Sequence, residues 1–445
     1  MLLAVSFSRT SRYFQASDYF LYQSDHLKLT PSKIVDSLRS TDINDLPDKK
    51  PNSDRVLTQV SPLTQKLWKI ALADVESNMV ETSKGRYFGA GKKFGVFVYT
   101  RDISYSGLLA LNKLYPEEML SSLRVTRDVR LSLGLKVSQG YTIPEISADW
   151  QEEKNLSEKQ FIRKYKTNSY TRRTDDVIWL WAARDLFEKN QDMADWQWLY
   201  SKGIQSFESL YWPFYDNQDG LFHGQSSFVD IHFQEVKATG YPQDFSMADC
   251  VLVKALSTNC LYYQGMLSMA IACGHLQKTE EKDLWLEKAE KLKQAIRTGL
   301  SLGNGRFSYF KDKTGKLQSR RDALGSALVV LSGIVEGNEA RECLSDYPES
   351  WAGIPIFDPF FPHETVYHNN TAWPFVDTFF LWAKEKAYRE DFSGYNAALL
   401  ARTCFEGKTF RELVNYNTKI PYRSDSQLWT ASSFLNVCLR KSGQL

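Results

Sequence analysis

The sequence predicts an all-α fold, an (α/α)6 toroid in which six helical hairpins form a ring. From residue 62 onward, about twelve stretches carry apolar residues at helical spacing. Sustained alternation of apolar and polar residues, which would indicate strands, is almost absent. Short and long connections alternate between the helices, as six hairpins arranged in a ring would need. The alternative fold is an irregular helical bundle or a helical-repeat binding protein.

The helix boundaries follow from start and stop signals. Ser61 precedes Pro62 at a first helical position, Asn370 and Thr371 precede a later apolar run, and Gly274 marks a stop. In chain order, the expected helices cover residues 62–79, 103–114, 116–133, 175–188, 193–211, 247–273, 279–300, 321–336, 338–345, 371–388, 391–405 and 427–440.

The regions outside these helices divide the chain. Residues 1–60 mix Ser, Asp, Pro and Lys and are expected to form an N-terminal extension or surface wrap, followed by one barrel domain over 61–445. The loops 135–174 and 211–246 are longer than ordinary connections between packed helices. Long loops in compact domains are often functional, so we expect the site there.

Composition excludes several classes of partner. The formal net charge is +2 and the charges are interspersed, which argues against nucleic acid. No run of about 18 apolar residues predicts a membrane span, and no motif implies a metal or another cofactor. The six cysteines lack metal-ligand spacing and are expected to be reduced core residues. The first residues fail as a secretory signal, which favours a cytoplasmic location, or a periplasmic one if a signal is missing. The oligomeric state stays open.

Aromatic residues make up 14% of the chain, which suits either a large core or a sugar-binding site. The stretch Tyr99-Thr100-Arg101-Asp102 opens a predicted helix and resembles a segment of the six-hairpin glycosidases, the group that includes glucoamylases, neutral invertases and the glucosidase domain of glycogen debranching enzymes. The resemblance implies that Tyr99, Arg101 and Asp102 grip sugar hydroxyls. Asp176, which opens the helix with Trp179, is expected to be a further substrate contact.

A loop rich in glycine and aromatic residues, 219–230, ends in Asp230 and is followed by Gly240-Tyr241-Pro242. It is similar to the loop of neutral invertases and debranching-type glucosidases that carries the general acid, which implies that role for Asp230. A general acid needs apolar surroundings that favour its protonated form. Asp216, Asp219 and Glu235 in the longer loop 211–246 are the competing carboxylates.

Two later segments complete the resemblance. Tyr367-His368-Asn369 with Trp373 is similar to a sugar-binding stretch of the same enzymes, although Asn370 stands where they have glycine. Near the C-terminus, Glu412 precedes a loop and a helix that opens on Gln427 and Trp429. Debranching-type glucosidases end similarly, and the glutamate before their last helix is the general base. These matches imply sugar contacts from His368, Asn369, Trp373, Gln427 and Trp429, and they make Glu412 the expected base with Glu364 as the alternative.

The resemblance therefore implies an exo-acting, inverting, metal-independent glycoside hydrolase that takes an oligosaccharide or glycoside, of the α-linked glucoside or mannoside type. In this mechanism one carboxylic acid protonates the glycosidic oxygen while a carboxylate activates the attacking water. Two other classes stay open: a non-catalytic carbohydrate-binding protein on the same fold, and a polysaccharide lyase on a related toroid.

Overall fold

The structure is a computed structural model that describes residues 13–15, 20–82, 85–94, 98–138, 174–190, 192–230, 240–245, 247–404 and 408–445. For residues 13–15, 82, 128–138, 174–176, 190 and 247–248 only the backbone is described. Most of the predicted loop 135–174, and residues 231–239 of the second long loop, lie outside these ranges.

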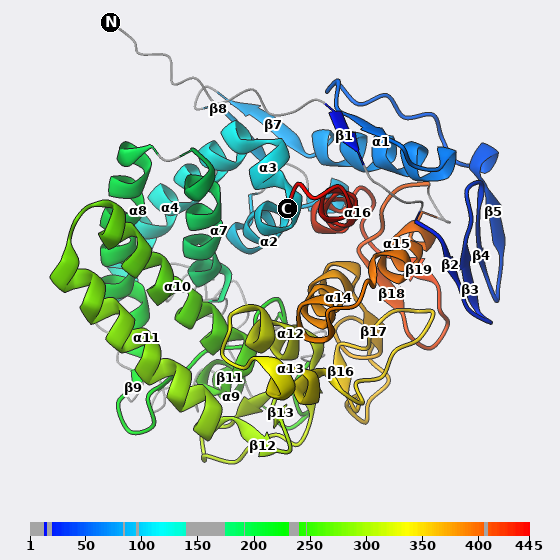
Figure 1. Ribbon diagram of the computed structural model, residues 1–445. Coiled ribbons are helices and arrows are strands. Elements are labelled where there is room, and N and C mark those ends of the chain that lie inside the picture. Colours follow the sequence, from blue (N-terminus) through cyan, green and yellow to red (C-terminus); the bar gives the residue numbers. More distant parts are fainter. Residues whose placement is uncertain are drawn as a thin grey trace, which may run out of the picture.

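The described helices form two concentric layers around one axis (Figure 1). The outer layer consists of α1 (Pro62–Glu76), α4 (Pro116–Ser138), α8 (Met193–Ser206), α11 (Thr279–Gly299), α13 (Gly337–Leu344) and α15 (Ser393–Arg402). The inner layer consists of α2 (Thr100–Ser106), α7 (Thr174–Asn190), α10 (Leu256–His275), α12 (Ala323–Leu331), α14 (Pro374–Tyr388) and α16 (Leu428–Lys441). Each inner helix contacts the next inner helix, and α16 contacts α2. The ring is closed, and the predicted (α/α)6 toroid is confirmed.

The residue pattern explains which helix is inside. In α10 nearly every residue from Leu256 to Cys273 is buried, as expected of a helix that is apolar all round. In α11 only Trp285, Ala289, Leu292 and Ile296 are buried, which is one stripe on a helix that faces solvent. The chain alternates between these two patterns, so each outer helix is followed by an inner one.

Three predicted helices are divided into separate elements, and the boundaries of the others differ from the observed ones by up to five residues. The helix expected over 103–114 begins at Thr100 and continues as η3 (Gly107–Leu111) and α3 (Asn112–Leu114). The helix expected over 193–211 ends in the turns η5 (Phe207–Tyr211) and η6 (Trp212–Phe214). The helix expected over 247–273 is split into α9 (Met247–Leu252) and α10 because β11 (Lys254–Ala255) pairs with β14 (Phe310–Lys311) between them.

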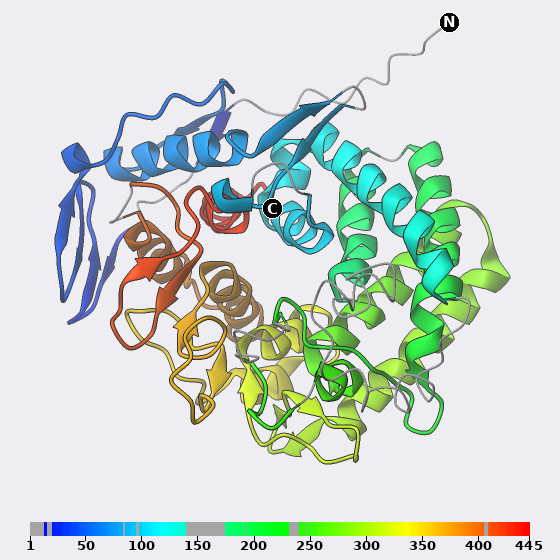
Figure 2. The same ribbon diagram turned by 180° about the vertical axis from the view of Figure 1, so that it is seen from behind.

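A small antiparallel sheet near the N-terminus packs on α15 at the edge of the ring (Figure 2). Its strands are β2 (Tyr22–Gln23), β3 (Leu27–Leu29), β4 (Lys33–Asp36) and β5 (Ser40–Asp42), in that order. Leu27, Leu29 and Ile34 are buried beneath it. Strands this short leave almost no alternation to detect, so the sequence did not indicate them. We propose that residues 1–60 form an extension covering the barrel of residues 61–445.

The other strands are short pairs in the connections between helices. They are β1 (Tyr13–Gln15) with β6 (Val56–Thr58), β7 (Met79–Thr82) with β8 (Gly85–Phe88), β9 (Tyr215–Asp216) with β10 (Leu221–Phe222), β12 (Ser301–Gly303) with β13 (Arg306–Phe307), β15 (Arg321–Asp322) with β16 (Phe357–Asp358), and β17 (Thr371–Ala372) with β18 (Leu413–Asn415) and β19 (Pro421–Tyr422). The short turns η1 (Ile43–Asp45) and η2 (Lys92–Phe94) complete the described elements.

Two further expectations bear on the core and on membranes. All six cysteines are buried and free, as predicted. Over the described ranges, no helix is both long and apolar enough to cross a membrane.

Candidate active site

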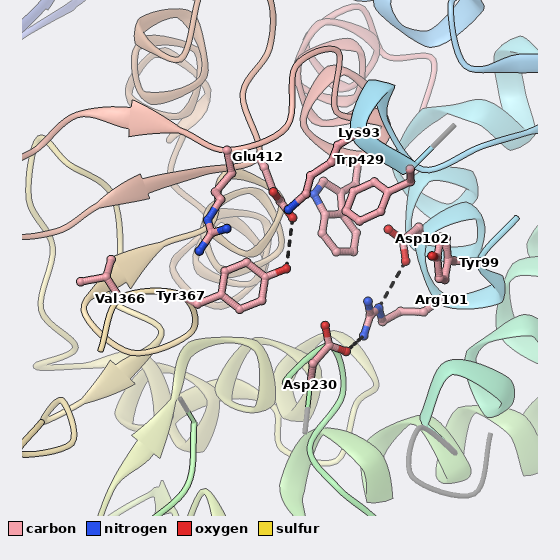
Figure 3. A pocket seen from close by; sticks show the side chains of 11 residues that line it. Lys93, Tyr99, Arg101, Asp102, Asp230, Val366, Tyr367, Glu412 and Trp429 are labelled. Atoms are coloured by element: carbon pink, nitrogen blue, oxygen red, sulfur yellow. Dashed lines mark hydrogen bonds and ion pairs between the residues drawn. The ribbon is translucent and has the colours of Figure 1, made fainter. Parts of the chain in front are cut away.

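A pocket of about 300 Å³ opens between the start of α2, the end of the loop 219–230 and the segments around β18 and α16 (Figure 3). It is lined by Lys93, Phe94, Tyr99, Arg101, Asp102, Asp230, Val366, Tyr367, Glu412, Arg423 and Trp429. Six of these were predicted from sequence: Tyr99, Arg101, Asp102, Asp230, Glu412 and Trp429. The ring thus brings residues from its first, middle and last hairpins to one place.

Arg101 is the centre of a buried charge network. Its Nη1 donates to Asp230 Oδ1 at 2.9 Å, and its Nε donates to Asp102 Oδ2 at 3.3 Å. Asp102 lies in the first turn of α2, where a carboxylate is favoured by the positive end of the helix dipole. One cation therefore serves two carboxylates, and the network fixes the position of the Asp230 carboxyl.

The loop that carries Asp230 is packed inside the ring. Its residues from Gln225 to Asp230 are all buried. Tyr105 of α2 and Ser227 share a hydroxyl hydrogen bond of 2.7 Å, and Ser257 of α10 accepts from the Ser227 N–H at 3.0 Å. The inner helices thus hold the loop from two sides and aim its last residue into the pocket.

Two backbone positions near Asp230, Phe228 and Gly240, are constrained by the packing around them. Phe228 has φ +57°, a conformation that side chains rarely adopt and that is found mostly where tertiary contacts enforce it. Its ring packs against those of His368 and Trp373. Gly240 lies so close to Val229 that an added Cβ would stand 2.2 Å from Val229 Cγ1. The glycine of the Gly-Tyr-Pro segment is therefore required by close packing.

Glu412 is buried on another side of the pocket, just before β18. Its Oε1 accepts from the Tyr367 hydroxyl at 3.3 Å, and its Oε2 accepts from the Ser424 N–H at 3.2 Å. Burial raises the pKa of Glu412 above its ordinary value, whereas the Ser424 N–H and the charges of Lys93 and Arg423 act in the opposite direction.

Trp429 forms an aromatic wall in the first turn of α16. Its ring stacks on Phe375 at 4.3 Å between centroids, and the Arg101 guanidinium lies 5.7 Å from it. Within the described part of the chain, its indole N–H has no hydrogen-bond partner. Its ring lines the pocket and is suited to packing against the C–H face of a sugar.

Three predicted sugar contacts lie behind the pocket and do not line it. His368 is fully buried and its Nε2 lies 3.4 Å from the backbone N–H of Asp230, so it supports the loop. The Asn369 side chain bonds both the N–H and the carbonyl of Phe361. Trp373 donates its indole N–H to the Tyr367 carbonyl at 3.0 Å. The polar atoms of these three side chains bond the backbone, so the residues support the segments that carry Asp230 and Tyr367.

Asn370, which stands where the similar enzymes have glycine, has φ +56°. Glycine adopts this left-handed conformation at no steric cost, and asparagine tolerates it better than most residues. The departure from the pattern therefore keeps the backbone geometry.

Among the described side chains, Gln427, Glu364 and the competing carboxylates Asp216 and Asp219 do not line the pocket either. Gln427 is fully buried at the start of α16, beneath Gly91. Glu364 is exposed. Asp176 lies at the start of α7, and its side chain is outside the described residues. Of the three competing loop carboxylates, Asp219 and Asp216 both accept from the Lys254 ammonium, at 2.8 and 2.6 Å, and Glu235 lies outside the described residues. This ion network lies apart from the pocket lining.

Five lining residues were not predicted. Tyr367 and Arg423 lie inside motifs that were recognised, but the pattern did not show that their side chains reach the pocket. Val366 is adjacent to Tyr367 and carried no polar signal. Lys93 and Phe94 lie on η2, a turn too short to leave a sequence signature.

No protein-family model matches the chain, and no curated protein matches it in sequence. In three dimensions it is similar to a glycosidase, of which one variant was solved in complex with glucose; the TM-score is 0.55 at 13% identity, over 86% of this chain and 97% of that chain. It is also similar to a family 78 rhamnosidase of Bacillus sp. GL1, with a TM-score of 0.52 at 13% identity, over 90% of this chain and 36% of that one. A sialidase gives a TM-score of 0.55 at 10% identity, over 84% and 33% of the two chains. At these identities the likeness shows the toroid fold, and the chemistry has to be argued from the pocket.

Proposed function

We propose that this chain is an inverting, exo-acting glycoside hydrolase with Asp230 as general acid and Glu412 as general base. The observation that carries the proposal is that these two carboxyl groups, from distant parts of the sequence, line one aromatic-walled pocket. Figure 3 shows them on different sides of it. The glycosidases among the proteins of similar fold support the same reaction class.

In the proposed reaction, Asp230 donates its proton to the glycosidic oxygen as the bond to the anomeric carbon breaks. Glu412 accepts a proton from a water molecule whose oxygen attacks the anomeric carbon from the opposite face. The products are an alcohol and a sugar of inverted anomeric configuration. Asp230 loses one proton and Glu412 gains one, so the pair is unchanged in total charge. Arg101 and Asp102 would hold hydroxyls of the sugar, with Trp429 against its apolar face.

One observation favours the exchanged roles as a second candidate. Arg101 bonds Asp230 at 2.9 Å, which stabilises the ionised form of that carboxyl. Burial raises the pKa of Glu412, which favours its protonated form. For Asp230 to act as the acid, sugar binding has to draw the Arg101 guanidinium toward Asp102 and the sugar hydroxyls.

Leaving-group dependence tests the proposal and distinguishes the two role assignments. A glycoside with a very good leaving group, such as dinitrophenolate or fluoride, needs no protonation and still needs the base. We expect Asp230→Asn to lose about 10²–10⁴ in kcat/KM on alkyl glycosides while retaining most activity on the activated ones. We expect Glu412→Gln to lose activity on both. The opposite pattern would establish the exchanged roles, and near-normal turnover of alkyl glycosides by both variants would refute the pair.

The first step is a screen of the unmodified protein against defined α-linked glucosides and mannosides. Proton NMR of the first-formed sugar gives the anomer, and an inverting enzyme releases the anomer opposite to that of the substrate. Retention of configuration would require a nucleophilic carboxylate and would exclude the proposed mechanism. Saturable binding without turnover of any glycoside would instead favour a sugar-binding protein.

A further inference from the structure

The pocket contains three cations, but only one of them is neutralised by its neighbours. Arg101 is bonded to both Asp102 and Asp230. Lys93 and Arg423 form no ion pair with any described residue, although both line the pocket and both are exposed. We call these two residues the rim cations.

The rim cations are held side by side by the backbone. The N–H of Lys93 donates to Ser424 Oγ at 3.3 Å, and the N–H of Lys92 donates to the Asp425 carbonyl at 3.1 Å. The turn η2 and the segment after β19 are thereby joined at one edge of the pocket. Two long cationic side chains thus start from adjacent backbone segments.

Arg423 is fixed more firmly than an ordinary surface arginine. Its backbone has φ +76°, a strained conformation for a side chain of this size, and such strain is found mostly at functional sites. Its guanidinium lies over the rings of Tyr367 and Tyr422, at 5.1 and 5.5 Å from their centroids. Stacking orients the plane of the guanidinium and leaves the N–H groups at its edge to donate to a planar anion.

Among the described carboxyls that line the pocket, Glu412 is the one on whose charge both rim cations act. It is buried and already accepts from Tyr367 and Ser424. The exposed rim therefore presents positive charge toward the space that a substrate would occupy (Figure 3).

We propose that the rim cations bind a carboxylate on the substrate, so that the preferred glycoside is acidic, with its carboxylate either on the sugar ring or on the leaving part. This inference rests on the proposed function for the identity of the pocket as a sugar site. Arg423 supplies paired N–H donors to the carboxylate, and Lys93 supplies a second charge from the adjacent segment.

The test measures binding, not turnover, so its outcome does not depend on the proposed catalytic roles. Calorimetry compares D-glucuronate, with its carboxylate on the ring, and D-gluconate, an open-chain acid, each beside its neutral amide. We expect at least one acid to bind about fivefold tighter than its amide for each rim cation, which is the upper range for an exposed ion pair. The preference should weaken with added salt.

Matched variants locate the effect. Lys93→Met and Arg423→Gln should each reduce the ratio of acid to amide affinity, and together they should abolish it. Lys92→Met, a neighbouring exposed lysine that does not line the pocket, should leave the ratio unchanged. Loss of a rim cation also favours the protonated form of Glu412, but this would strengthen the binding of an acid, so a reduced ratio reports the lost contact with the carboxylate. Equal affinity for acids and amides, absence of binding by all four compounds, or an equal loss in Lys92→Met would overturn the proposal. A failure of the hydrolysis screen with this preference intact would reject the proposed function alone.

Discussion

Replacing Asp322 with asparagine should remove a large pH dependence from the stability of the ring. Asp322 precedes α12 and its Oδ2 accepts from the Gly325 N–H at 2.7 Å, so it caps this inner helix. Burial raises its pKa from 3.8 to about 7. Asparagine caps a helix equally well and does not titrate.

The direction and size follow from the two pKa values. Between them, the folded protein keeps a proton on Asp322 that the unfolded chain has lost, so stability decreases as pH rises from about 4 to about 7. The shift from 3.8 to about 7 corresponds to about 4 kcal/mol at about 1.4 kcal/mol per pH unit. The stability of Asp322→Asn relative to the unmodified protein should therefore increase by a few kcal/mol between pH 4 and pH 8.

Paired urea denaturation at several pH values between 4 and 8 measures this difference, because all other titrating groups are common to both proteins. Asp192→Asn is the matched control, since Asp192 caps the outer helix α8 from a partly exposed position. A constant difference between Asp322→Asn and the unmodified protein over this pH range would refute the reasoning, as would an equal change in the control.

Three further predictions concern the pocket. Because burial raises the pKa of Glu412, the acid limb of the pH–rate profile for kcat/KM of the proposed hydrolase should lie at a higher pH than the pKa of an ordinary glutamate would give. Lys93→Met removes a charge that lowers this pKa, so it should move the acid limb to a still higher pH. Trp429→Leu removes the ring that lines the pocket and stacks on Phe375, so sugar affinity by calorimetry should fall by about 0.5–1.5 kcal/mol. Arg101→Met leaves two buried carboxylates without their cation, so it should lower the free energy of unfolding by about 3–5 kcal/mol at neutral pH and by less in acid, where they protonate; a loss that is the same at both pH values would contradict this.

The helical layer pattern was predictable because it depends on local spacing. Stripes such as that of α11 and the uniform apolarity of α10 are both visible in the sequence. Closure of the ring was predictable only from the number of helices, their alternating connections and the resemblance, because no local pattern indicates that α16 contacts α2. The N-terminal sheet was missed since its strands have two to four residues.

The site was predicted where a charged residue opens a helix or ends a loop, as with Arg101 and Asp230. It was not predictable where the role of a residue depends on whether its side chain points into the pocket or away from it. His368 and Asn369 were expected to contact sugar, but a buried imidazole or amide beside a loop can equally support backbone, and here both do. Arg423 lies in a recognised segment, but its position at the pocket depends on a positive φ that the sequence does not predict.

Closure of the ring also has a consequence for synthesis of the chain. The Asn78 amide donates to the Ser426 carbonyl at 2.7 Å, and the Leu428 N–H donates to the Ala90 carbonyl at 3.0 Å. These bonds join the first hairpin to the last one, and the pocket lies beside that junction. On a translating ribosome, Arg101 and Asp230 emerge long before Glu412 and Trp429, so the nascent chain has only half of its sugar site until the last hairpin leaves the exit tunnel. Appearance of sugar binding would therefore report the moment of ring closure.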